Sequence, residues 1–124
     1  MGRPHSFSRH ERLKSQKIIA NVFASGQVLS KYPLKVFYLP AQGFADHQST
    51  VVVPKKIFKL AVDRNKLKRR MREAYRLHKV ILQGDTPISM LWIFTGKDIS
   101  QFKTIEVAII HLLYVLHRRL AQVT

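Results

Sequence analysis

The segment of residues 62–82 constrains the fold of this chain more than any other. Plotted at about 100° per residue, its apolar side chains gather on one side of a helix. That side holds Leu67, Met71, Ala74, Tyr75, His78, Ile81 and Leu82. Another arc, roughly 100° wide, holds Asn65, Lys68, Arg69, Arg72, Arg76 and Lys79. The pattern predicts a helix that packs on a core with one side and exposes a row of cations on another.

Positive charge is concentrated around this helix. Eleven of the 22 Lys and Arg residues lie between positions 55 and 79, where only Asp63 and Glu73 offset them. They are Lys55, Lys56, Lys59, Arg64, Lys66, Lys68, Arg69, Arg70, Arg72, Arg76 and Lys79. Cations four residues apart on a helix, such as Lys68 and Arg72, repel each other, and bound phosphates would relieve that repulsion. The alternative is an ordinary solvated helix face.

The chain of 124 residues carries a formal charge of +15. Self-repulsion of that size opposes folding, so the excess charge indicates a polyanionic partner, and nucleic acid is favoured over an acidic membrane surface. The alternative is that the charge serves solubility alone. The absence of cysteine excludes disulfides, thiolate metal sites and a cysteine nucleophile. The polar first 12 residues are unlike a secretory signal, and the apolar run 107–116 is too short to span a bilayer. We therefore expect a cytoplasmic protein without membrane contact.

The other elements follow from apolar periodicity and from the positions of Gly and Pro. Residues 1–12 predict a flexible basic arm, and residues 15–25 a helix that Gly26 ends. Strands are expected at 28–30, 34–39, 50–53 and 88–95, the last one covered on both faces. A final helix at 104–121 has a core stripe of Ile105, Ile109, Leu112, Leu116 and Leu120. The order α-βββ-α-β-α predicts a single α/β domain over residues 1–124, an α+β sandwich of three helices on a small four-stranded sheet.

The start of the basic helix carries a specific motif. Lys55-Lys56 precedes Ala61-Val62-Asp63-Arg64-Asn65-Lys66-Leu67-Lys68-Arg69, and Arg72-Glu73 follows. In this combination the chain resembles the bacterial ribonuclease P protein family, whose signature joins a Lys pair to an Arg-Asn-Arg helix start. Three positions depart from the family pattern. Lys66 replaces the usual Arg, Pro54 replaces a common Ser, and Phe58-Lys59-Leu60 replaces a glycine-containing turn.

The resemblance implies a ribosomal-protein-S5-like fold with an uncommon left-handed β-α-β crossover through the basic helix. It also implies that this helix faces the catalytic RNA subunit of ribonuclease P. The RNA contacts would come from Arg64, Asn65, Lys66, Lys68, Arg69, Arg72 and Arg76. For Asn65 two interpretations stay open: its amide could bridge RNA groups or position a hydrated ion, or it could cap the helix N-terminus.

The resemblance implies a second surface, a cleft between the first helix and the sheet that binds the single-stranded 5′ leader of precursor tRNA. The matching positions are Ile19, Phe23 and Phe37, and the candidate basic flanks are Lys17, Lys35, Lys55 and Lys56. Aromatic side chains there can stack on unpaired bases of any sequence, while the cations follow the phosphate backbone. The alternative is that Phe23 and Phe37 are core residues.

No residue pattern predicts catalysis or metal binding by the protein itself. None of the 6 His pairs with another His or a carboxylate at metal-ligand spacing, and 7 scattered acidic residues do not predict a two-metal site. Hydrolysis and Mg²⁺ binding are therefore assigned to the RNA, and the protein would bind the leader and reduce the Mg²⁺ requirement. The alternative function is that of a ribosomal protein or a general RNA chaperone. Val107, Ile110 and Tyr114 make the last helix apolar almost all round, which leaves deep burial and self-association both open.

Overall fold

The computed structural model describes residues 15–41 and 45–123, so the predicted basic arm at residues 1–12 lies outside the described residues. The elements are α1 (Gln16–Ser25), β1 (Gln27–Lys31), β2 (Leu34–Pro40), β3 (Gln48–Val52), α2 (Ala61–His78), the short 3₁₀ helix η2 (Lys79–Leu82), β4 (Ile88–Phe94) and α3 (Phe102–Val123). Apart from η2, this order is the predicted α-βββ-α-β-α, which is confirmed.

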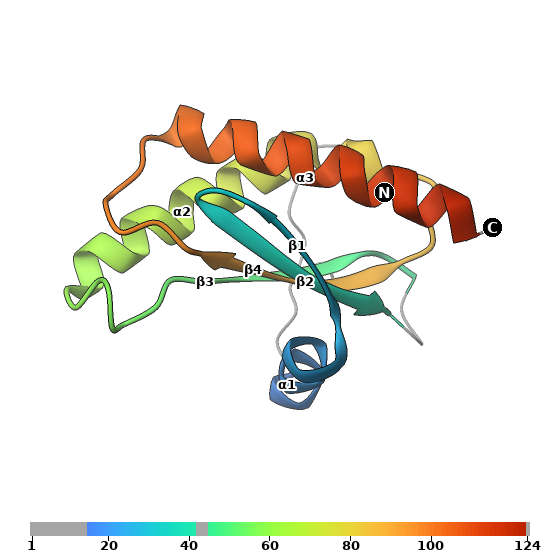
Figure 1. Cartoon of the computed structure of the whole chain (residues 1–124), viewed down its shortest axis with the longest axis horizontal. Coiled ribbons are helices and arrows are strands. Elements are labelled where there is room, and N and C mark those ends of the chain that lie inside the picture. The colour runs from blue at the N-terminus through green and yellow to red at the C-terminus, as the bar shows by residue number, and fades with distance from the viewer. Residues whose placement is uncertain (1–14, 42–44, 124) are drawn as a thin grey trace.

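The strands form one four-stranded mixed sheet in the order β1-β2-β4-β3 (Figure 1). Strand β2 lies antiparallel to β1 and β4, whereas β3 lies parallel to β4, and α2 lies in the connection between these two parallel strands. Helices α2 and α3 cover one face of the sheet, and α1 lies on the other face (Figure 1). The predicted α+β sandwich is confirmed. The left-handed sense of the crossover follows from the resemblance alone and stays a prediction.

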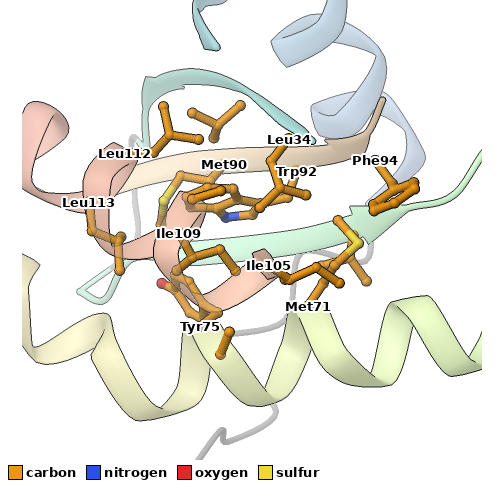
Figure 2. Packing of buried hydrophobic residues seen from close by; sticks show 14 of the residues in the cluster. Leu34, Met71, Tyr75, Met90, Trp92, Phe94, Ile105, Ile109, Leu112 and Leu113 are labelled. Carbon is orange, nitrogen blue, oxygen red and sulfur yellow. The ribbon is translucent and has the colours of Figure 1, made fainter. Parts of the chain in front are cut away.

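The hydrophobic core lies between the sheet and the pair of helices α2 and α3. Trp92 of β4 is fully buried, and its ring lies 6.1 Å from that of Tyr75. Met71 and Tyr75 pack toward it from α2, and Ile105 and Ile109 from α3 (Figure 2). The buried positions of α2 recur every three or four residues, so this packing turns the opposite side of α2 to solvent. The predicted core sides of both helices are confirmed.

The end of α2 differs from the expected helix over residues 62–82. The α-helix ends at His78, where φ is −117° and ψ is 1°, and the chain continues as the 3₁₀ helix Lys79–Leu82. This tighter turn buries Leu82 and leaves Ile81 at the margin of the core. Apolar periodicity alone does not distinguish a final 3₁₀ turn from a further turn of α-helix.

The start of β3 also differs from the expectation. The sequence predicts a strand from Thr50, whereas the structure begins it at Gln48. Gln48 and Ser49 pair with β4 and are both buried. A strand can start with polar residues when its backbone completes the ladder of a neighbour, and a hydrophobic pattern does not report that pairing.

Candidate nucleic-acid interface

The solvent side of α2 carries the residues predicted to contact RNA, and we call it the cationic face. Asn65, Lys66, Arg69 and Arg72 are exposed, whereas Arg64, Lys68 and Arg76 are half-buried. The helix starts at Ala61, and its N-cap Leu60 makes no side-chain capping bond. Asn65 therefore stands in the second helical turn, and its interpretation as an N-cap is wrong. Its exposed amide remains among the cations of this face.

Arg64 turns away from the cationic face toward the loop of residues 53–60, which carries Lys55 and Lys56. Its Nη1 donates hydrogen bonds to the carbonyl oxygens of Phe58, at 2.8 Å, and Lys59, at 2.9 Å. These bonds tie the start of α2 to the loop that presents the Lys pair. Sequence reasoning missed this role, because a basic residue at a helix start gives no sign of what its guanidinium will contact.

The loop of residues 53–60 has a second anchor in Phe58. The buried Phe58 ring makes an edge-to-face contact with Phe94 of β4, with ring centroids 5.6 Å apart. Its backbone N–H donates to the carbonyl oxygen of Pro54 at 3.1 Å. The Phe58-Lys59-Leu60 sequence, which departs from the family's glycine-containing turn, therefore holds the loop by a core contact instead of by a flexible residue.

Two further arginines of α2 have partners within the protein. Arg70 donates from Nη1 to the carbonyl oxygen of Ser100, at 2.5 Å, and so links α2 to the segment before α3. Arg76 forms an exposed ion pair with Glu73, with 2.5 Å between Nη2 and Oε1. The hydrogen bond from Arg76 lowers the pKa of Glu73 below its ordinary value of 4.5. Glu73 therefore stays ionised and reduces the positive charge at one end of the cationic face.

On the other face of the sheet, α1 and the strands border a groove with a volume of about 790 Å³, which we call the α1 groove. Its lining residues are Gln16, Ile19, Ala20, Phe23 and Ala24 of α1, with Val52, Leu91 and Ile93 of the sheet. Directly paired residues on neighbouring strands point to the same face. Leu91 pairs with Phe37 on one side and Thr50 on the other. The register therefore places the Phe37 ring on the same face of the sheet as Leu91, which lines the groove.

Phe23 and Phe37 form an aromatic pair beside the α1 groove. Their ring centroids are 5.1 Å apart and the planes are inclined by 40°. Phe23 is 52% exposed, Phe37 is half-buried, and neither belongs to the core cluster. The alternative that both are core residues is therefore wrong. Ile19, the third predicted position, is half-buried on the groove wall.

Helix α1 is fixed over the sheet by a close backbone approach at Gly26. The Gly26 N–H donates to the carbonyl oxygen of Val22 at 2.9 Å, and Val22 is the buried residue of α1. A Cβ at position 26 would lie 2.3 Å from that oxygen and 3.0 Å from the carbonyl oxygen of Tyr38. The φ of Gly26 is −73°, so glycine is required here for space and not for a left-handed turn.

The predicted basic flanks fall in two places. Lys35 is in the same cross-strand row as Val52, and β3 runs from that row into the loop with the exposed Lys55 and Lys56. These three cations therefore share one end of the sheet. Lys17 is exposed on α1. The loop of residues 53–60 connects the end of the α1 groove with the cationic face.

Two histidines among the described residues lie beside carboxylates. His78 Nε2 lies 2.9 Å from Glu106 Oε2, and His117 Nδ1 lies 2.7 Å from Asp85 Oδ2. Hydrogen bonding from His78, helped by Lys103, lowers the pKa of Glu106 below its ordinary value of 4.5. Within residues 15–41 and 45–123, no group of three or more His, Asp or Glu side chains is placed to hold a metal ion. In the same ranges no helix is long and apolar enough to cross a membrane.

Known proteins resemble the chain in both sequence and fold. The family model for ribonuclease P matches residues 7–113. The ribonuclease P protein component of Porphyromonas gingivalis is 36% identical over 106 residues, which cover 80% of this chain and 77% of that protein. That of Chlorobium phaeobacteroides is 40% identical over 80 residues, covering 60% of this chain and 55% of that protein.

Solved structures repeat the same architecture. The RNase P protein from Thermotoga maritima superposes with a TM-score of 0.71 at 25% identity, over 85% of this chain and 96% of that protein. The RNase P protein of Staphylococcus aureus shares the fold, with a TM-score of 0.72 at 20% identity, over 86% of this chain and 94% of that protein. By sequence and by structure, this chain belongs to the ribonuclease P protein family.

Proposed function

We propose that this chain is the protein subunit of a ribonuclease P that removes the 5′ leader from precursor tRNA, and that it acts by binding two RNA segments. The cationic face of α2 binds the catalytic RNA, and the α1 groove binds the single-stranded leader. The observation that carries the proposal is the Phe23–Phe37 ring pair, with Phe23 exposed, beside a groove that ends at three cations. We expect the protein to act in the cytoplasm, where precursor tRNA is made.

The cationic face suits the phosphates of a structured RNA. The exposed guanidinium groups of Arg69 and Arg72 can each donate two parallel hydrogen bonds to one phosphate, and Lys66 adds a point charge. Neutralised phosphates release counterions, so binding should weaken steeply with salt. The Asn65 amide, which both donates and accepts, can bridge two RNA groups between these charges.

The α1 groove suits unpaired bases without a preference for sequence. Ile19, Phe23, Leu91 and Ile93 give it an apolar wall and floor, with Gln16 as a polar lining residue. Every base has an apolar face that can stack on an aromatic ring, whereas recognition of one base needs several fixed donors and acceptors. A groove of this composition therefore supports binding of leaders with different sequences.

Cleavage itself is assigned to the RNA partner. Mg²⁺ bound by that RNA would supply the attacking hydroxide and stabilise the leaving oxygen. The protein's own groups bind and orient: the cations reduce repulsion between leader and catalytic RNA, and the aromatic pair holds the leader in place. Because the protein then supplies charge that Mg²⁺ would otherwise supply, less Mg²⁺ should be required.

Multiple-turnover cleavage of a 5′-extended precursor tRNA at low Mg²⁺ tests this function. The reactions contain the protein alone, a matching catalytic RNA alone, or both. We expect strong activity only when both are present. No stimulation by a folded, RNA-binding protein would favour a ribosomal or RNA-chaperone role, and cleavage by the protein alone would reveal a catalytic site of its own.

The leader site has a sharper test in Phe23→Ala. Stacking of one base contributes about 1–3 kcal/mol, so the substitution should weaken binding of leader-bearing precursor by about 5- to 150-fold and leave mature tRNA binding unchanged. The matched control is Tyr32→Ala, which removes an aromatic ring that is 69% exposed in the β1–β2 turn, outside the groove. An equal loss for precursor and mature tRNA would contradict the assignment.

A further inference from the structure

A second pocket, of about 450 Å³, lies at the end of the sheet away from the Lys35 row. Its lining residues are Gln27, Tyr38, Leu39, Pro40, Thr86, Ile88, Arg119 and Leu120. They come from β1, β2, the segment before β4 with the start of that strand, and the C-terminal part of α3. Tyr38 and Ile88 belong to the core cluster on the helix side of the sheet, so this pocket is separate from the α1 groove. Neither the cationic face nor the groove uses any of its residues.

The rim of this pocket holds an arginine whose contacts are neutral. Tyr38 donates from its hydroxyl to Gln27 Oε1 at 3.0 Å. Arg119 Nη1 lies 3.3 Å from the Tyr38 hydroxyl and 3.5 Å from Gln27 Oε1. Both Arg119 contacts are long for N–H···O hydrogen bonds, and neither partner is a carboxylate. Among the described residues the guanidinium contacts no carboxylate, so it can exchange these contacts for stronger bonds to an anion.

The walls beside this arginine are apolar. Pro40, Leu120 and the buried Ile88 line the space. The Tyr38 hydroxyl and the Gln27 amide add hydrogen-bonding groups to this apolar lining. An apolar slot with one cation at its mouth thus matches a planar ring that carries an adjacent anion.

We propose that this pocket binds one unpaired nucleotide of RNA, with its phosphate on Arg119 and its base between Pro40 and Leu120. Nucleic acid is favoured over an acidic peptide or a lipid headgroup because the pocket combines apolar lining residues, the Tyr38 and Gln27 hydrogen-bonding groups and the Arg119 cation in a chain of charge +15. The proposal goes beyond the two RNA surfaces above, since it adds a third contact on the edge of the molecule that β1 and α3 form.

Titration of the full chain with uridine and adenosine 5′-monophosphates, followed by amide chemical shifts in NMR, tests the proposal. We expect shifts at Gln27, Thr86 and Leu120 that saturate together. Arg119→Ala should weaken this binding about tenfold, as loss of one charge-assisted hydrogen-bond donor does. Tyr38→Phe keeps the packed ring and removes only the hydroxyl, so it should weaken binding less.

The matched control is Arg118→Ala. Arg118 is the exposed neighbour of Arg119, carries the same charge and does not line the pocket. If both variants weaken binding equally, the attraction is general electrostatics and the proposal fails. The proposal also fails if a saturating concentration of mononucleotide changes the chemical shifts of α1-groove amides alone, or of no amides. Phe23→Ala, measured alongside, separates this result from the leader site, because that variant should leave mononucleotide binding to the pocket intact.

Discussion

Replacing Arg64 by Ala removes the two hydrogen bonds that join the start of α2 to the carbonyl oxygens of Phe58 and Lys59. Hydrogen bonds from a charged donor contribute about 1.5–3 kcal/mol each when well covered, and Arg64 is only half-buried. We therefore expect a loss of about 1–2 kcal/mol in the free energy of unfolding. For a chain of 124 residues this corresponds to a fall in Tm of roughly 3–10 °C.

The effect of Arg64→Ala on RNA binding should be indirect. The Nη1 contacts of Arg64 go to the loop, so its loss should loosen the segment that presents Lys55 and Lys56 and weaken binding several-fold, with little change in the slope of log K against log salt. Arg69→Ala is the matched variant. Arg69 is exposed on the cationic face, so its loss should barely change Tm and should reduce that slope by about one.

Thermal unfolding by circular dichroism and RNA binding at several salt concentrations measure these quantities. A second comparison uses Lys55→Ala. If Arg64 acts through the loop, the two substitutions together should cost less binding energy than the sum of their separate effects. The reasoning would be refuted if Arg64→Ala left Tm unchanged and reduced the salt slope by as much as Arg69→Ala, because Arg64 would then contact phosphate directly.

Three further predictions concern charge, pH and packing. Glu73→Gln should tighten RNA binding a few-fold in a filter-binding assay, because it removes the anion that pairs with Arg76, and it should change stability by less than about 1 kcal/mol. Weaker binding would show that the ion pair itself orders Arg76 for RNA. Glu106→Gln should lower stability at neutral pH, measured by urea unfolding. The native pKa of Glu106 lies below its ordinary value of 4.5, so its contribution is full above that value and lost as pH falls through the native pKa. The difference in the free energy of unfolding between variant and wild type should therefore shrink in acid. A difference that stays constant with pH would contradict the linkage to Glu106. Leu112→Ala should cost about 2–5 kcal/mol in the same unfolding assay, because Leu112 is fully buried, and should leave the salt slope of RNA binding unchanged.

The fold was largely predictable because its main signals are periodic. The apolar side of α2 and the strongly apolar run of β4 place both elements in the core, and each is found there. What the sequence could not indicate is pairing between distant segments. Gln48 and Ser49 appear polar and turn-like, yet they form the start of β3, because the adjacent β4 supplies their ladder partners.

For the candidate site, the sequence predicted which face of α2 carries the cations better than it predicted what each side chain contacts. The cations of α2 were placed correctly on its solvent side, since burial of the other side determines which face remains. The partner of Arg64 depends on how the loop of residues 53–60 folds back, which no spacing reports. Likewise, whether Phe23 is core or exposed depends on how α1 packs on the sheet, and the structure leaves Phe23 52% exposed.

The placement of α1 and α2 on opposite faces of one sheet has a geometric consequence (Figure 1). A leader on the α1 side and a catalytic RNA on the α2 side would be held apart by the strands and by the packed layer that contains Trp92. Protein interiors are close-packed and compress little. The protein would then act as a rigid spacer between these two RNA segments. The thickness of the sandwich would set the minimum distance between their negatively charged backbones.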